Sequence, residues 1–172
     1  IGADQAVRIN MKPLDSFSTA KEISNYVSEN PFDLIIAGKE SSDYNGGAVP
    51  GIIADMLNIP FVNACNGLEI EGNEVTLNRE IDGGIEKIKA SLPIIIGGQK
   101  GLVEESELRI PNMRGIMTAR SKPLNIVETN NPMTMSKSIQ FEKPAAKGEC
   151  KMVSSDNIDQ LVNMLQNEAK VI

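Results

Sequence analysis

The feature that most constrains the fold of this chain is a single stretch, residues 33–57, with the sequence DLIIAGKESSDYNGGAVPGIIADML. It begins with the continuous apolar run of residues 34–37, which is typical of a strand buried on both faces. It ends in apolar residues at helical spacing, namely Ile52, Ile53, Met56 and Leu57. The stretch therefore predicts a strand, a loop and a helix in succession, which is the basic unit of a parallel α/β sheet.

The loop in this unit is rich in glycine and small polar residues, including Gly38, Lys39, Asp43, Gly46 and Gly47. A loop of this kind binds phosphate or a nucleotide well, because the helix N-terminus offers unpaired N–H groups and glycine lets a ligand approach the backbone. The chain has neither a Walker-type motif nor a spaced G-x-G-x-x-G motif, so an ordinary strand-to-helix connection is an equally good interpretation. For Asp43, a helix cap or an Asx turn is the structural alternative to ligand contact.

Composition excludes several classes of function. The 172 residues carry a net charge of −6, which argues against nucleic acid as a partner, and no apolar run approaches the ~20 residues that span a bilayer. Histidine is absent, which weakens any hydrolase or zinc-enzyme interpretation. The two cysteines, Cys65 and Cys150, are far apart, so we expect free thiols in a reducing, cytoplasmic environment.

The rest of the chain predicts further α/β elements. We expect a helix after residue 19, where Thr19 and Glu22 have the spacing of a capping box, and its end at Asn30 and Pro31. Residues 61–70 and 92–97 are predicted strands. Two glycine turns between them, at residues 71–73 and 82–84, indicate an antiparallel meander, although residues 85–92 are also compatible with a short helix.

The C-terminal part differs in character. A short helix at residues 113–121 and a strand at residues 124–127 complete the expected core, and residues 129–151 show little apolar pattern. A helix is predicted at residues 156–169. We therefore expect an α/β core at residues 1–128 and an extended arm with a C-terminal helix at residues 129–172.

One segment makes a family recognisable. The run REIDGGIE at residues 79–86, followed by Pro93 and the apolar residues 94–96, resembles the signature of the electron-transfer flavoprotein beta subunit. The resemblance extends to Ile1-Gly2-Ala3-Asp4, to Ala37-Gly38-Lys39 with Asp43, and to Ile110-Pro111-Asn112 with Lys122-Pro123. It covers nearly the whole chain.

The resemblance implies a Rossmann-like, adenine-nucleotide-binding three-layer fold with a mostly parallel sheet. It implies a heterodimer with an alpha subunit that holds the redox FAD, and electron transfer from flavin dehydrogenases, such as acyl-CoA dehydrogenases, to a further acceptor. AMP or a second FAD would bind the central loop, at Gly38, Lys39, Asp43, Gly46, Gly47, Ala48 and Val49. The docking loop for the dehydrogenase would be Arg109, Ile110, Pro111 and Asn112. The chain would be an electron carrier and not a classical catalyst, with the chemistry supplied by flavin.

Two departures from the family pattern leave alternatives open. Gly46, Gly47, Ala48 and Val49 stand where many members have polar side chains that hold the nucleotide, so backbone donors remain but side-chain donors are few. The family's first strands are also expected upstream of Ile1, so we expect this chain to be truncated at its N-terminus. The alternatives are a stand-alone adenine-nucleotide-binding protein and a structural subunit that has lost its nucleotide.

Overall fold

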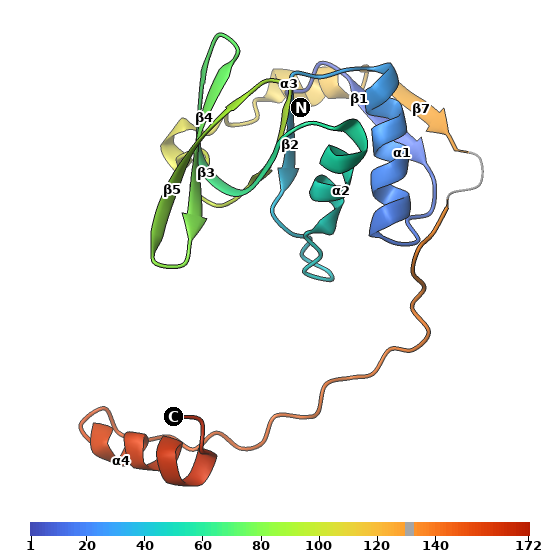
Figure 1. Cartoon of the computed structure of the whole chain (residues 1–172). Helices are drawn as coiled ribbons and strands as arrows, with labels where there is room; N and C mark the ends of the chain where they lie inside the picture. Colours follow the sequence, from blue (N-terminus) through green and yellow to red (C-terminus); the bar gives the residue numbers. More distant parts are fainter. Residues whose placement is uncertain (130–132) are drawn as a thin grey trace. The chain divides into compact units, whose positions relative to one another are not determined.

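The computed structural model describes residues 1–129 and 133–172 of the chain (Figure 1). The chain divides into two units, Ile1–Lys137 and Ser138–Ile172. The first unit holds the sheets and the larger helices. The two units are described separately below.

The larger sheet of the first unit has five strands in the order β2-β6-β3-β4-β5. Strands β2 (Leu34–Gly38), β6 (Ile94–Gly98) and the first part of β3 (Phe61–Glu71) are parallel neighbours. Strands β4 (Glu74–Ile81) and β5 (Gly84–Ser91) continue from β3 as an antiparallel meander. Both predicted glycine turns are confirmed, and residues 84–91 form a strand, so the alternative of a short helix there is wrong.

Two helices cover one face of this sheet. Helix α1 (Ser16–Glu29) packs beside α2 (Ala48–Leu57), as Figure 1 shows in blue and teal. The two helices share a core cluster with β6, formed by Ala20, Ile53, Ala54 and Ile95. The strand-loop-helix unit predicted from residues 33–57 is thus present, and the expected Rossmann-like α/β class with mostly parallel strands is confirmed.

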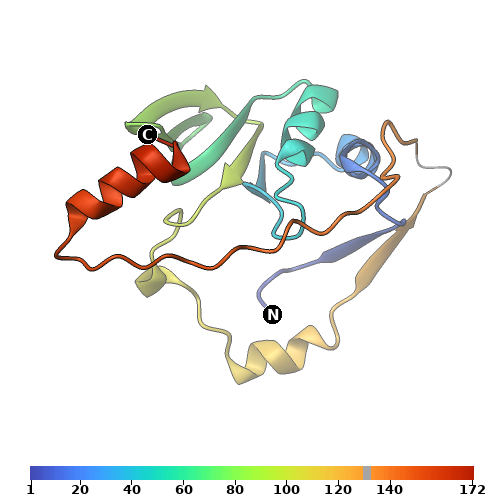
Figure 2. The same ribbon diagram turned by 90° about the horizontal axis from the view of Figure 1, so that it is seen from below.

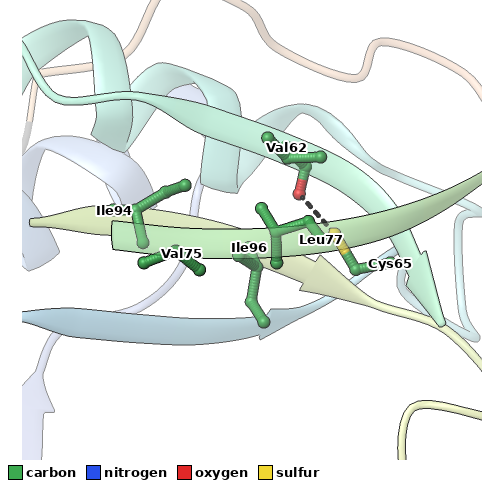
Figure 3. Packing of buried hydrophobic residues seen from close by; sticks show 6 residues of the cluster. All are labelled: Val62, Cys65, Val75, Leu77, Ile94 and Ile96. Atoms are coloured by element: carbon green, nitrogen blue, oxygen red, sulfur yellow. Dashed lines mark hydrogen bonds between the residues drawn. The ribbon is translucent and has the colours of Figure 1, made fainter. Parts of the chain in front are cut away.

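The opposite face of the sheet holds a second core cluster, which Figure 3 shows at close range. Its members come from β3, β4 and β6 and are Val62, Cys65, Val75, Leu77, Ile94 and Ile96. All but Val62 are fully shielded from solvent. Successive isoleucines of β6 therefore serve different clusters, since Ile94 and Ile96 face the meander while Ile95 faces the helices. This explains why β6 is a continuous apolar run.

Strand β3 bends where it changes partner. It pairs with β6 from Phe61 to Cys65 and with β4 from Cys65 to Glu71, so Cys65 pairs with both neighbours, and the register shifts on both sides of Cys65. Ala64, between Val62 and Cys65, adopts a positive φ of 56°. Such irregularities are β-bulges, which increase local twist and redirect a strand. The bend lets β4 lie across the sheet so that Val75 and Leu77 pack against the isoleucines of β6 (Figure 3).

A second, two-stranded sheet has no strand pairing with the larger sheet in the described structure. Strand β1 (Ala6–Asn10) pairs in parallel with β7 (Leu124–Glu128), and Figure 2 shows the two side by side. Before β7, the short 3-10 helix η1 (Glu105–Glu107) and helix α3 (Met113–Ala119) follow β6. The predicted positions of the short helix and of the last strand are confirmed.

Two local predictions were wrong. Strand β2 was expected to be buried on both faces, but it pairs with β6 on one side only in the described structure, and Ile36 is 57% exposed. The helix cap was expected at Thr19, but α1 begins one turn earlier, with Asp15 as its N-cap. Asp15 accepts the N–H of Ser18, and Ser18 Oγ accepts the N–H of Asp15, so the capping box is Asp15 with Ser18.

The second unit consists of an irregular segment followed by one helix. The helix has an α-helical first half, α4 (Ile158–Asn163), and a π-helical second half, η2 (Met164–Ala169). Its ion pair, Lys151 Nζ to Glu168 Oε2 at 2.6 Å, ties the preceding segment to the helix. Within residues 1–129 and 133–172, no helix combines the length and the apolarity needed to cross a membrane.

Candidate functional site

The central loop connects the carboxyl end of β2 to the N-terminus of α2. Its start is fixed to the sheet, because the N–H of Lys39 donates to the carbonyl of Gly98 at the end of β6, at 3.1 Å. The loop therefore opens at the carboxyl edge of two parallel strands. This edge is where open α/β sheets bind their ligands.

Ser41 closes the loop on itself. Its N–H donates to the carbonyl of Gly46 at 2.9 Å, and its Oγ accepts the N–H of Gly46 at 3.1 Å. These two bonds hold residues 41–46 as a compact turn. They also occupy the N–H of Gly46, which is one of the backbone donors expected from the sequence. Ser41 was not among the predicted site residues, and its role depends on a pairing five residues apart that no local pattern specifies.

Asp43 has a local structural role in this loop. Its Oδ1 accepts the N–H of Tyr44 at 2.8 Å. The hydroxyl of Ser41 and this N–H lower the pKa of Asp43 from its ordinary value. The carboxylate is exposed and stays ionised at neutral pH. It is not the cap of α2, because the residue at that position is Gly47.

The N-terminus of α2 provides backbone donors without a side-chain cap. Gly47 occupies the N-cap position, and no side chain bonds the first turn. The first four N–H groups of a helix lack partners within the helix, and Pro50 has no N–H group. The free donors therefore include the N–H groups of Ala48 and Val49. The side chain of Val49 packs against the cluster between the helices, so only its backbone is available.

Space is tight at position 47. A Cβ there would lie 3.1 Å from the carbonyl oxygen of Lys39, which is tighter than an ordinary van der Waals contact. Gly38 and Gly46 are more open, with the nearest atoms to such a Cβ at 3.8 and 3.4 Å. The close approach is to the backbone carbonyl of Lys39 and brings the start of the loop next to the uncapped helix N-terminus. Free backbone N–H groups at a helix N-terminus fit a phosphate group.

A second close approach lies at the same edge of the sheet. The Oδ1 atom of Asn63 on β3 lies directly over Gly97 of β6, where a Cβ would collide with it. This oxygen is buried and has no hydrogen-bond partner in the described part of the chain. Asn63 was not predicted as a site residue. One unpaired acceptor alone does not make it a ligand-binding residue.

The predicted docking segment lies far from the loop in sequence and is exposed. Arg109, Pro111 and Asn112 are all solvent-exposed, and Ile110 is 87% exposed. Asn112 caps α3, since its Oδ1 accepts the N–H of Gly115 at 2.7 Å. Ile110 is thus held on an irregular segment between η1 and a capped helix, outside both core clusters.

Comparison with known proteins gives a consistent result. The family described as "Electron transfer flavoprotein domain" matches residues 1–132. The chain is 33% identical over 186 residues to the electron transfer flavoprotein subunit beta of Bacillus subtilis, a match that covers 100% of this chain and 71% of the relative. This chain belongs to the electron transfer flavoprotein family.

Other relatives support the same assignment. The chain is 34% identical over 149 residues to the electron transfer flavoprotein subunit beta of Syntrophomonas wolfei, with 86% of this chain and 58% of the relative covered. It is 29% identical over 173 residues to the probable electron transfer flavoprotein subunit beta of Schizosaccharomyces pombe, with 96% and 65% covered. The chain thus spans less than two thirds of the length of these two relatives.

The family signature has a structural role in this chain. Residues 79–86 form the end of β4, the tight turn and the start of β5. Gly83, at the turn, has a φ of +90°, which favours glycine. Arg79 and Glu86 are directly paired across the hairpin and form an ion pair at 3.3 Å. The acid–Gly–Gly turn therefore shapes the meander, as its local interpretation predicts.

Proposed function

We propose that this chain acts as the beta subunit of an electron transfer flavoprotein, as a heterodimer with an FAD-bearing alpha subunit. The observation that carries this proposal is the match to beta subunits over the whole chain. Electrons would come from flavin dehydrogenases, such as acyl-CoA dehydrogenases, and pass to a downstream acceptor. Histidine is absent, and such a role needs no side-chain acid or base, because flavin supplies the electron chemistry.

The chain's own contribution at the central loop would be to bind and orient a nucleotide. We propose that the N–H groups of Ala48 and Val49, at the positive end of α2, hold the phosphates of AMP or of a second FAD. Lys39 would add a positive charge on the same side. The close fit of Gly47 against the Lys39 carbonyl supports this arrangement, because it holds the start of the loop against the N-terminus of α2.

The negative groups of the loop limit what it can bind. Asp43 is ionised and Glu40 is one residue from Lys39, so a phosphate would sit beside two carboxylates. The bond from Gly46 to Ser41 further reduces the number of donors. These observations favour a site that depends on few backbone contacts. They also keep open a structural subunit without nucleotide as the second candidate function.

The exposed segment at Arg109–Asn112 is proposed as the contact with the dehydrogenase. An isoleucine side chain that is 87% exposed contributes little to folding, and it gains most when a partner pocket covers it. Met113 and Met117 on α3 are also exposed, at 72% and 69%, and extend the apolar surface next to Ile110 in sequence. Methionine adapts well to a partner surface because it is flexible and polarisable.

Co-expression with the alpha subunit tests the proposed assembly. A tagged chain should retain the alpha subunit through affinity and size-exclusion steps, and the complex should contain about one flavin per alpha chain, measured after denaturation. Nucleotide released from the complex, separated by chromatography, identifies the occupant of the central loop. A chain that retains nucleotide but never the alpha subunit would favour the stand-alone alternative and would contradict the proposal.

A further inference from the structure

The N-cap of α1 uses its two carboxylate oxygens for different purposes. Oδ1 of Asp15 accepts the N–H of Ser18 at 2.7 Å, which caps the helix. Oδ2 accepts the N–H groups of Met135 and Ser136, at 2.7 and 2.8 Å, and Ser136 Oγ lies 3.4 Å away. Capping needs only one acceptor. The second oxygen can therefore accept hydrogen bonds from a segment 120 residues further along the chain.

These contacts have the features of a strong anchor. Hydrogen bonds to an ionised carboxylate are shorter and stronger than neutral ones, and both backbone bonds are within the range for such bonds. The N–H groups of Ser18, Met135 and Ser136 together hold the pKa of Asp15 well below its ordinary value. The ionised carboxylate that the geometry requires is thus present throughout the neutral range.

The anchored residues lie just before the second unit. Residues 133–137 have no regular secondary structure, and the second unit begins at Ser138. Among the described residues, the other side-chain hydrogen bond from this segment to α1 is Lys21 Nζ to Met133 Sδ at 3.9 Å, which is weak. Asp15 therefore provides the main polar contacts that fix the described residues of this segment to the helix.

We propose that Asp15 is the anchor that fixes the point at which the second unit is attached to the core. Without the carboxylate, residues 133–136 become part of the tether. With it, the tether starts at Lys137. A shorter tether raises the effective concentration of the second unit at any binding site that lies close to the core. Exposed apolar side chains on that unit, Ile139 at 95%, Phe141 at 75% and Met152 at 86%, are the groups whose presentation depends on the anchor.

Two substitutions separate the anchor from the cap. In Asp15→Ser, the hydroxyl can still cap α1 by accepting the N–H of Ser18, but a second acceptor is absent. Asp15→Asn keeps the shape and replaces one acceptor by a donor, which would face the donors of Met135 and Ser136. Ser18→Ala is the matched control, because it removes the hydroxyl that bonds Asp15 N–H and leaves the carboxylate unchanged.

The readout is hydrogen exchange of backbone amides in the purified chain, resolved by NMR. Exchange at Met135 and Ser136 should rise on the order of tenfold or more in Asp15→Ser and Asp15→Asn, from the loss of charge-assisted hydrogen bonds. Amides in the middle of α1 should change much less. Exchange at Met135 and Ser136 should stay near wild type in Ser18→Ala.

Cleavage by trypsin after Lys137 gives a second measurement that does not require assignments. It should accelerate in both Asp15 variants and remain unchanged in Ser18→Ala. Wild-type exchange and cleavage in both Asp15 variants, or an equal change in Ser18→Ala, would overturn the proposal. If the Asp15→Ser chain fails to fold, the Asp15→Asn chain decides the question, since Asn caps helices as well as Asp.

A consequence for assembly rests on the proposed function. Affinity for the alpha subunit should fall in the Asp15 variants if the second unit takes part in the contact. Hydrogen exchange and trypsin cleavage are measured without any partner, so they test the role of Asp15 even if the chain does not bind the alpha subunit. Failure of the proposed function is therefore distinguishable from failure of the proposed anchor.

Discussion

Replacing Ile110 by alanine should weaken docking of a partner dehydrogenase and leave the fold intact. The substitution removes three carbon atoms, each worth ~0.8 kcal/mol when buried, and the side chain is 87% exposed in the free chain. Full burial by a partner would therefore supply ~2 kcal/mol, which corresponds to a roughly thirtyfold weaker dissociation constant in the variant. Because the side chain lies outside both core clusters, the free energy of unfolding should change by less than ~0.5 kcal/mol.

The assay compares two variants in the heterodimer with the alpha subunit. Electron transfer from an acyl-CoA dehydrogenase is measured as a function of heterodimer concentration, and thermal unfolding is measured in parallel. Leu77→Ala is the matched control, because Leu77 is 0% exposed and its truncation should cost roughly 2–5 kcal/mol of folding stability. Ile110→Ala should raise the concentration for half-maximal transfer at unchanged stability. A large loss of stability in Ile110→Ala with unchanged transfer would refute the reasoning.

Three further predictions follow from the geometry. Gly47→Val should abolish nucleotide retention, because its side chain would crowd the carbonyl of Lys39 beside the donors of α2. The control Gly51→Ala, whose Cβ would make an ordinary 3.5 Å contact with Phe61, should retain the nucleotide, and equal nucleotide content in both variants would contradict the site. The difference in unfolding free energy between wild type and Asp15→Asn should be complete above about pH 4 and shrink as the pH falls, because the pKa of folded Asp15 lies below its ordinary value; denaturant titrations that show a constant difference down to about pH 2 would exclude this. Ile36→Lys should reduce self-association of the isolated chain, because β2 has an unpaired edge in the described structure and a lysine protects such edges; sedimentation that shows a monomeric wild type would contradict the expectation.

Local patterns predicted the elements of the core well, because each pattern reflects one strand or one helix. The apolar run at residues 34–37 correctly indicated β2, but its burial depends on which strands flank it. In the described structure β2 is an edge strand of the larger sheet, and Ile36 is exposed. Periodicity also left residues 85–92 open between helix and strand. The choice is made by pairing with β4, where Leu77 lies opposite Ile88.

The candidate site shows the same division between local and distant information. A glycine-rich loop before a helix is a local pattern, and the sequence located it correctly between β2 and α2. Its internal bonds, such as Ser41 to Gly46, depend on the exact turn and reduce the donors that the pattern implied. The position of the helix cap was ambiguous in the sequence, because Thr19 with Glu22 and Asp15 with Ser18 have the same spacing. The contact between Asp15 and Met135 spans 120 residues, so no local pattern could reveal it.

The central claim is that this chain completes an electron transfer flavoprotein together with an alpha subunit. The most direct measurement is anaerobic stopped-flow absorbance of the alpha-subunit flavin, mixed with an acyl-CoA dehydrogenase that has been reduced by its substrate. The account predicts rapid bleaching of the flavin when this chain and the alpha subunit are both present, and much slower bleaching with the alpha subunit alone. Flavin reduction at the same rate with and without this chain would contradict the account.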